Sequence, residues 1–178
     1  MSNKILLNSQ KIEIILNRLV YELIENHKDF NDTVLIGLQP RGVDLLREII
    51  RIFNLNHKNL EIKHGILDYT FFRDDFRRSE KTHTASLTQL NFPIENKKIV
   101  LIDDVLFTGR SIKAAMTSID TYGRPKSIEL LTLIDRRFKR EIPIEANYCG
   151  VKIDTFKGDR VRVVWDKNSS KNVIYIEN

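Results

Sequence analysis

Two aspartates stand side by side in this chain, Asp103 and Asp104, directly after the apolar run Ile-Val-Leu-Ile at 99–102. Adjacent carboxylates repel each other and gain nothing from burial unless a ligand donates hydrogen bonds to them. The neighbouring hydroxyls of a ribose would do so, and each hydrogen bond to a charged acceptor is worth about 1.5–3 kcal/mol. The same charges favour a sugar ring that becomes positive as its C1 bond breaks. We therefore predict that this pair binds a ribose and supports chemistry on it.

A Thr-Gly-Arg-Ser turn follows at 108–111, where a helix is expected to begin. Backbone N–H groups at a helix N-terminus lack partners within the helix, and the helix dipole attracts anions there. Gly109 lets the backbone approach a ligand closely, while Thr108 and Ser111 add hydroxyl donors. This turn is predicted to hold a terminal phosphate.

The strand and helix around these groups must bring them to one edge of the protein. The β-branched run at 99–102 has no polar alternation, which is typical of a strand buried on both faces of a parallel sheet. Ligands of open α/β sheets bind outside the carboxyl ends of such strands. The alternative is an ordinary strand-turn-helix junction in which the aspartates cap the helix. The complete 13-residue pattern favours the ligand site.

A second turn, at 39–42, repeats this arrangement after the apolar run at 33–38. Gly42 opens a predicted helix and Arg41 offers a two-pronged donor, which together suit a pyrophosphate that carries magnesium. Taken alone, the turn is more simply a strand-to-helix connection with a surface arginine.

Strands and helices alternate along the chain, which predicts an α/β fold with a mainly parallel core sheet. A polar stretch at 73–91 is too long for a tight turn and is typical of a lid or binding loop. Apolar periodicity predicts helices at 9–26, 42–53 and 110–122, and strands at 33–38, 60–69, 99–102, 127–134, 147–153, 160–165 and 173–176.

The composition is that of an ordinary globular protein: 178 residues, 42% hydrophobic and 30% charged. This length predicts a single domain, 1–178. A net charge of +5 and a pI of about 9.3 suit phosphate-rich ligands. Cys149 is the only cysteine, which excludes an intrachain disulfide and favours a reducing compartment. With neither a signal-peptide pattern nor an 18-residue apolar run, the sequence predicts a cytoplasmic protein with no membrane partner.

Residues 99–111 resemble the phosphoribosyl pyrophosphate (PRPP) signature of type I phosphoribosyltransferases. Together with four further segments they resemble the bifunctional pyrimidine operon regulator/uracil phosphoribosyltransferase family over almost the whole chain. Those segments are VLIGLQPRGVDLL at 34–46, LDYTFFRDDF at 67–76, GRPKSIELLTLIDR at 123–136 and REIPIEANYCG at 140–150.

The resemblance implies a type I phosphoribosyltransferase-like α/β fold, with a mainly parallel central sheet flanked by helices, a mobile lid loop and a small C-terminal hood of short strands. It implies a pentosyltransferase that makes UMP and pyrophosphate from PRPP and uracil. Magnesium would be held by Asp103 and Asp104 indirectly, through PRPP and water. Arg73, at the base of the lid, would act in catalysis with the two aspartates. PRPP is expected to contact Asp103, Asp104, Val105, Leu106, Phe107, Thr108, Gly109, Arg110 and Ser111.

The resemblance also assigns the pyrophosphate to Gln39, Pro40, Arg41 and Gly42. Gln39 and Pro40 replace the Lys-Thr usual in the family. A lysine charge is lost, and Pro40 has no backbone N–H to donate. An altered affinity for pyrophosphate is therefore expected.

Phe107 bears on the choice of base. Hypoxanthine-type enzymes place an aspartate at this position to contact the purine, and a phenylalanine cannot exchange a proton. This disfavours a 6-oxopurine without excluding it. A purine phosphoribosyltransferase is therefore the alternative. The resemblance implies a base pocket formed by Arg136, Asp154, Thr155, Phe156 and Lys157, with Asp154 in place of a proline common in the family.

A further alternative is a nucleotide-sensing RNA-binding regulator with little catalysis, and one protein can combine both activities. Members of the family bind a pyrimidine-operon leader RNA when UMP occupies the site. Glu145 and Val151 stand where the family often has arginine and lysine, and a solvated basic surface is an equal explanation of the charge. The resemblance also implies a homodimer or higher homo-oligomer. The implied RNA-binding residues are Arg18, Arg137, Lys139, Arg140 and Lys152.

Overall fold

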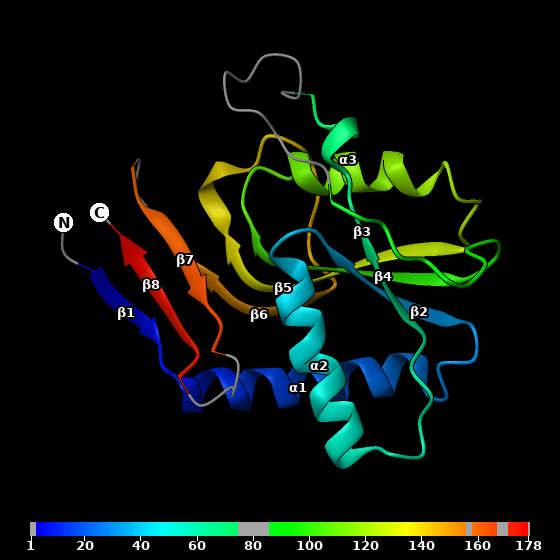
Figure 1. Ribbon diagram of the computed structural model, residues 1–178. Coiled ribbons are helices and arrows are strands. Elements are labelled where there is room, and N and C mark those ends of the chain that lie inside the picture. Colours follow the sequence, from blue (N-terminus) through cyan, green and yellow to red (C-terminus); the bar gives the residue numbers. More distant parts are fainter. Residues whose placement is uncertain (1–2, 75–85, 156–157, 167–170, 178) are drawn as a thin grey trace.

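A five-stranded parallel sheet forms the centre of the computed structural model, which describes residues 3–74, 86–155, 158–166 and 171–177. Its strands lie in the order β3-β2-β4-β5-β6, and every neighbouring pair is parallel (Figure 1). The prediction of a mainly parallel core sheet is confirmed. The strands are β2 (Thr33–Leu38), β3 (His64–Leu67), β4 (Lys98–Leu106), β5 (Ser127–Arg136) and β6 (Tyr148–Ile153).

The central position of β2 and β4 explains their apolar sequences. All six residues of β2 are buried, as are the four residues at 99–102 in β4. Each of these strands is paired on both sides and covered on both faces, so no position of β2, or of 99–102 in β4, alternates toward water. This confirms the burial that the unbroken apolar runs predict.

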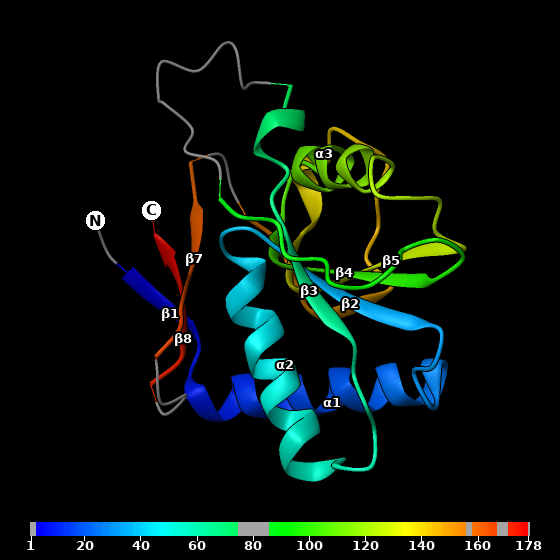
Figure 2. The ribbon, with the colours of Figure 1, turned by 45° about the vertical axis from the view of Figure 1, so that its right-hand side comes forward.

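Helices cover both faces of the sheet. Figure 2 shows α1 (Ser9–His27) and α2 (Gly42–Asn56) on one side and α3 (Arg110–Ile119) on the other. The side chain of Asn8 caps α1 by accepting a hydrogen bond from the backbone N–H of Lys11 at 3.0 Å. The buried side chains accordingly form two clusters, one on each face of the sheet. Helices α2 and α3 begin at the two predicted ligand turns, which places these turns at the carboxyl edge of the sheet.

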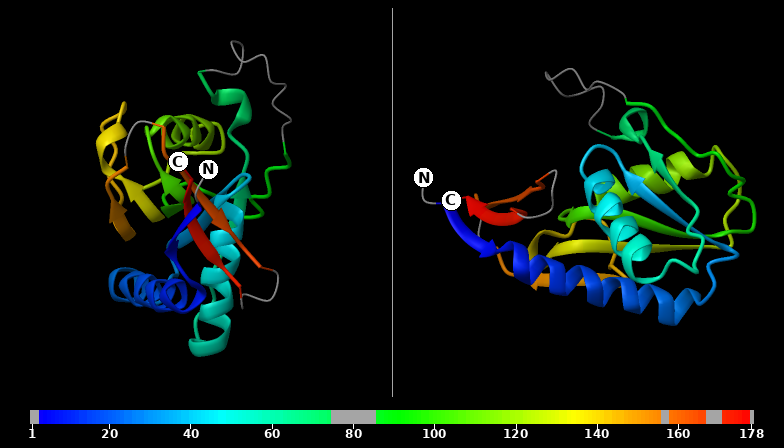
Figure 3. Two further views of the ribbon diagram at one scale, coloured as in Figure 1. Left: turned by 90° about the vertical axis from the view of Figure 1, so that its left-hand side faces the viewer. Right: turned by 60° about the horizontal axis from the view of Figure 1, so that its bottom comes forward.

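A second sheet is built from both ends of the chain. It is antiparallel, in the order β1-β8-β7, and consists of β1 (Asn3–Leu7), β7 (Arg160–Val164) and β8 (Val173–Glu177). Both termini lie at this sheet (Figure 3). It is the predicted hood of short strands, but β1 was not predicted from the sequence, and the predicted strand at 147–153 belongs to the central sheet as β6. The hood is therefore C-terminal only in part.

Several predicted bounds change. The strand expected at 60–69 shortens to β3, because only four of its residues pair with β2. Helix α3 ends at Ile119 instead of continuing to 122, whereas α2 continues beyond 53 to Asn56. Short 3₁₀ turns follow β3 and β5, namely η1 (Thr70–Phe72) and η2 (Arg137–Lys139). Of the helices in the described ranges, none combines the length and the apolar character needed to cross a bilayer.

Candidate functional site

The two adjacent aspartates lie inside β4, which continues past Ile102 and ends at Leu106. Helix α3 begins only at Arg110, with Gly109 as its N-cap, so the alternative that the aspartates cap this helix is wrong. Asp104 is 3% exposed, and Asp103 is half-buried. We refer to these two residues as the aspartate pair.

Burial and nearby charges shift the pKa values of the two aspartates. Burial is the largest influence on Asp103 and, with the charge of Asp104, raises the pKa of its carboxyl to about 8. Burial also raises the pKa of Asp104, while Arg41 opposes this rise. Within the described part of the chain, neither carboxylate forms an ion pair with a lysine or arginine. The pair therefore meets the condition for a ligand site, because it offers largely buried acceptors that no ion pair compensates.

The predicted phosphate turn opens α3 beside this pair. Gly109 adopts φ +87°, a left-handed conformation that favours glycine, and the N–H of Arg110 donates to Thr108 Oγ1 at 3.3 Å. A cavity of about 290 Å³ is lined by this turn, by Asp103 and by Arg73. The structure thus joins the turn to the aspartate pair in one open space.

The second predicted turn packs directly against β4. A β-carbon on Gly42 would lie 2.1 Å from the carbonyl oxygen of Ile102, so only glycine allows this approach. Gln39, Pro40 and Arg41 line a cavity of about 330 Å³ together with the aspartate pair. The sequence predicted two ligand turns after two strands, and in the structure both turns line cavities that also contact the aspartate pair.

The side of this cavity that is predicted to hold the base carries a stacked arginine. The guanidinium carbon of Arg136 lies 4.0 Å from the ring centroid of Phe107, and both residues line the cavity. Arg136 Nε donates to Thr155 Oγ1 at 3.1 Å, and its Nη2 donates to the carbonyl of Asp159 at 2.9 Å. Burial lowers the pKa of this guanidinium.

The other residues that were predicted to bind the base do not line the cavity in the described part of the chain. Asp154 forms a two-pronged ion pair with Arg137, at 2.7 and 2.8 Å, and does not line either cavity. Phe156 and Lys157 lie outside the described residues, as does most of the predicted lid, at 75–85. Arg136 and Thr155 are thus the base candidates that the structure brings together.

Two residues that line the cavity were not singled out from the sequence. Tyr69, 8% exposed, follows β3, and Val161 comes from β7 of the hood. Burial, followed by the charge of Asp103, raises the pKa of the Tyr69 hydroxyl. No pattern in the sequence marks Val161, because its contact with the site depends on how the hood folds back over the sheet.

Of the predicted RNA-binding cations, Arg18 and Arg137 are both engaged with the protein. Arg18 Nη2 donates to the carbonyls of Cys149 and Gly150 at 2.9 and 2.7 Å. Arg137 is held by Asp154, as described above. About half of each side chain is covered by the protein: 46% of the Arg18 side chain and 51% of the Arg137 side chain is exposed.

The remaining three predicted cations differ from one another. Arg140 pairs with the buried carboxylate of Asp135 and is 20% exposed. Lys152 pairs with Glu145 at 3.1 Å. Lys139 has no ion-pair partner among the residues that the structure describes. Much of the positive charge on this face is therefore neutralised from within.

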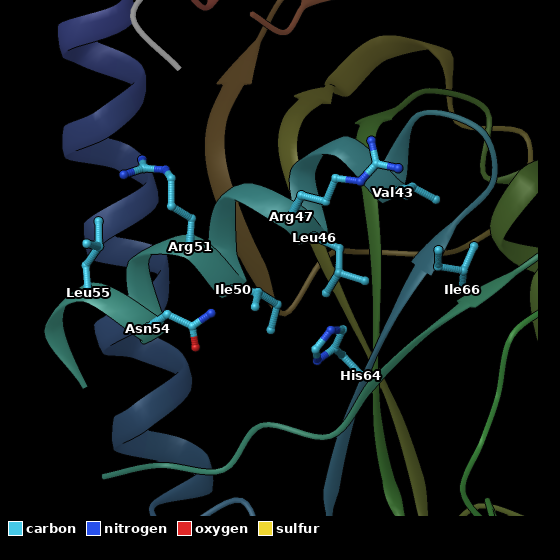
Figure 4. A pocket seen from close by; sticks show the side chains of 9 residues that line it. All are labelled: Val43, Leu46, Arg47, Ile50, Arg51, Asn54, Leu55, His64 and Ile66. Carbon is cyan, nitrogen blue, oxygen red and sulfur yellow. The ribbon is translucent and has the colours of Figure 1, made fainter. Parts of the chain in front are cut away.

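A larger cavity, of about 530 Å³, lies between α2 and β3, away from the aspartate pair (Figure 4). Apolar side chains, among them Leu46, Ile50 and Ile66, line most of it. Its two arginines, Arg47 and Arg51, form ion pairs within or beside α2. Its size therefore does not mark it as the site of phosphoribose chemistry, which needs buried acceptors and anion-binding turns.

The chain is similar to known proteins over almost its whole length. The model of the phosphoribosyl transferase domain matches residues 2–168. A bifunctional protein PyrR from Ligilactobacillus salivarius is 40% identical over 179 residues, covering 96% of both chains. The bifunctional protein PyrR of Caldicellulosiruptor bescii is 39% identical and covers 98% of this chain and 94% of its own.

Solved structures show the same fold. The hypoxanthine phosphoribosyl transferase of Trypanosoma cruzi superposes with a TM-score of 0.71 at 15% identity, covering 98% of this chain and 91% of that one. A hypoxanthine phosphoribosyltransferase from Staphylococcus aureus gives 0.66 at 24% identity, with 86% and 80% coverage. At such identities the likeness extends to the fold alone. On the full-length sequence matches, this chain belongs to the phosphoribosyl transferase family and, within it, to the group of bifunctional PyrR proteins.

Proposed function

We propose that this protein transfers the phosphoribosyl group of PRPP to N1 of uracil, giving UMP and pyrophosphate. One observation carries the proposal: a largely buried carboxylate pair, with no ion-pair partner among the described residues, shares its cavities with two helix-opening turns at the carboxyl edge of a parallel sheet. A sugar diol, a 5′-phosphate and a pyrophosphate are the groups that this arrangement suits.

In the proposed reaction, the bond from ribose C1 to the pyrophosphate oxygen breaks and a bond from C1 to uracil N1 forms. The aspartate pair accepts hydrogen bonds from the ribose hydroxyls and stabilises positive charge on the ring. The turn at 108–111 anchors the 5′-phosphate, and Arg41 with the turn at 39–42 holds the departing pyrophosphate. The N1 proton of uracil leaves to solvent. Positioning and charge supply most of the rate enhancement.

Magnesium fits this site as part of the substrate complex. No cluster of three or more histidine, cysteine or acidic side chains within the described ranges is able to hold a metal by itself. The aspartate pair does offer hard oxygen ligands, and magnesium is commonly bound by one or two carboxylates, water and substrate phosphates. We therefore propose that magnesium arrives with PRPP and neutralises the pyrophosphate, with Asp103 and Asp104 contacting it through PRPP and water.

The base pocket favours a pyrimidine. Phe107 offers no acceptor for a purine N–H, and Arg136 is stacked on it with two of its nitrogens already bonded. The ring and the guanidinium form a flat wall, and the remaining N–H groups of Arg136 suit the carbonyl groups of uracil. The relatives named bifunctional protein PyrR support the same choice over the purine alternative.

A second role, UMP-dependent binding of a pyrimidine-operon leader RNA, is supported by those relatives' name and by one local observation. Phe138, 68% exposed on η2, lies between Arg137 and Lys139. An exposed aromatic ring beside cations is a platform on which an unpaired base stacks. The internal pairing of Arg18, Arg137, Arg140 and Lys152 argues for weak binding. Homodimers or larger assemblies stay a prediction, which sedimentation of the purified protein tests.

Steady-state turnover with PRPP, magnesium and a panel of bases tests the proposed reaction. We expect pyrophosphate release with uracil, and at least a hundredfold lower kcat/KM with hypoxanthine, guanine and adenine, a ratio of the size that unpaired polar groups produce. Preferential use of hypoxanthine would establish the purine alternative. A separate titration with a uridine-rich leader hairpin, with and without UMP and at two salt concentrations, tests the regulatory role.

A further inference from the structure

The phosphate turn is bonded to a segment that follows η2. The backbone N–H groups of Glu141 and Ile142 both donate to the carbonyl oxygen of Thr108, at 2.9 and 3.0 Å. The Nη1 group of Arg140 donates to the carbonyl oxygen of Phe107. Two consecutive carbonyls at the start of the turn are therefore engaged by residues 140–142.

This engagement matters for the binding of an anion. Carbonyl oxygens repel phosphate, whereas backbone N–H groups attract it, so the turn binds phosphate only if its carbonyls face elsewhere. Residues 140–142 do not line the cavity that the turn opens into. A β-carbon on Gly109 would lie 3.2 Å from Cβ of Ile142, so the segment packs closely against the turn. The segment thus holds the carbonyls away from the phosphate position.

Arg140 connects this turn to the neighbouring strand. While its Nη1 bonds the Phe107 carbonyl, its Nη2 donates to Oδ1 of Asp135 near the end of β5. Asp135 is 3% exposed, so this carboxylate depends on Arg140 for its compensation. The planar guanidinium suits two acceptors at a fixed separation. A side chain that is held at both ends and is only 20% exposed is poorly placed to contact RNA.

Resting on the proposed function, we infer that Arg140 is a positioning residue for recognition of the 5′-phosphate. It fixes the Phe107 carbonyl against β5, and the N–H groups of the following turn are thereby presented to the ligand. This role differs from the RNA contact that the family resemblance implies for Arg140.

The Arg140→Lys variant tests the inference, because lysine keeps the charge beside Asp135 but lacks a fork that reaches two acceptors. We expect the Kd for ribose 5-phosphate and the KM for PRPP to rise about tenfold, the loss of one charge-assisted hydrogen bond, while kcat changes less than threefold. The affinity for pyrophosphate should stay the same, since its turn at 39–42 does not contact residue 140. Arg124→Lys, the same change at an exposed position, is the matched control and should alter none of these values.

The double variant Arg140→Gln/Asp135→Asn keeps a neutral, hydrogen-bonded pair and guards against misfolding of the single variant. It should lose affinity for ribose 5-phosphate to a similar degree, with a melting temperature near that of the wild type. An unchanged affinity in folded variants, or an equal loss for pyrophosphate, would overturn the inference, as would a loss confined to RNA. If the wild type itself bound neither PRPP nor ribose 5-phosphate, the proposed function would fail first.

Discussion

Buried ionisable side chains lie at both the amino edge and the carboxyl edge of the central sheet, but the described residues supply side-chain partners to the cluster at the amino edge and not to the aspartate pair at the carboxyl edge. At the amino edge, His27 Nδ1 lies 3.0 Å from the hydroxyl of Thr33, and its Nε2 lies 3.0 Å from the hydroxyl of Tyr148. That tyrosine donates to Glu129 at 2.7 Å. At the carboxyl edge, the aspartate pair has no such set of partners. Asp103 Oδ1 accepts a hydrogen bond from the backbone N–H of Asp104 at 3.0 Å, but the described residues supply no side-chain partner for either carboxylate.

The difference shows how a site can be distinguished from a structural cluster. Burial is the main cause of shifted pKa values at both edges: it lowers the pKa of His27 and raises those of Tyr148 and the aspartate pair. A shifted pKa alone therefore does not separate the two. What separates them is compensation, because folding normally supplies a partner for each buried polar group. The aspartate pair has no ion-pair partner among the described residues and lines an open cavity, and this combination indicates a ligand.

The largest expected effect comes from the carboxyl edge. Asp104→Asn should lower kcat/KM with PRPP and uracil by about 10²–10³-fold, because a charge that supports the positive ribose is removed. Its melting temperature should stay level or rise, since a repulsion between buried carboxylates is relieved. Asp120→Asn, an exposed change at the end of α3, serves as the control. Turnover within threefold of the wild type would remove the pair from catalysis, and RNA affinity measured without UMP should not change.

At the amino edge, the same kind of deletion should affect stability instead of activity. His27→Ala removes the ring shared by Thr33 and Tyr148 and is expected to lower the free energy of unfolding by about 2–4 kcal/mol, a loss typical of broken buried networks. Denaturant unfolding measures this, with His64→Ala as an exposed control. The KM for PRPP in the folded fraction should equal that of the wild type; a raised KM would show that the two edges are coupled.

The stability of the protein should depend on pH through the buried His27. Burial holds the pKa of folded His27 below its usual 6.5, so the unfolded chain takes up a proton first as the pH falls. The contribution of His27 is thus complete above about pH 6.5 and declines below it, by at most about 1.4 kcal/mol per pH unit. The difference in unfolding free energy between the wild type and His27→Gln should accordingly shrink from pH 7 to pH 5. A constant difference would contradict a neutral, buried His27.

The smallest expected effect concerns the basic face. Glu145 is 78% exposed and pairs with Lys152, a surface contact worth about 0–1 kcal/mol. Glu145→Arg should raise affinity for a leader hairpin a few-fold at low salt and steepen the salt dependence by about one to two ions. Glu61→Arg, near the opposite edge strand β3, makes the same change of charge elsewhere. Equal effects of both variants would mean that only net charge matters and that this face is not the RNA interface.

Where local structure depends on neighbours in the chain, the sequence predicted it well. The apolar strand, the aspartate pair and the turn at 108–111 are contiguous, so their order alone places them at one edge of a parallel sheet. The turn at 39–42 follows from the same rule. These predictions succeed because strand burial, helix starts and glycine turns are set by short-range periodicity and sterics.

Partners that lie far apart in the sequence were decided only by the tertiary structure. Strand β1 joins the hood by pairing with β8 at the other end of the chain, and Arg18 bonds the carbonyl of Gly150. Arg140 bonds the carbonyl of Phe107, and Arg137 pairs with Asp154. Both cations are therefore held within the protein, although the sequence alone suggests that they are free. The sequence shows the sign of a side-chain charge, but the role of that side chain depends on which acceptor the folded chain brings within hydrogen-bond distance.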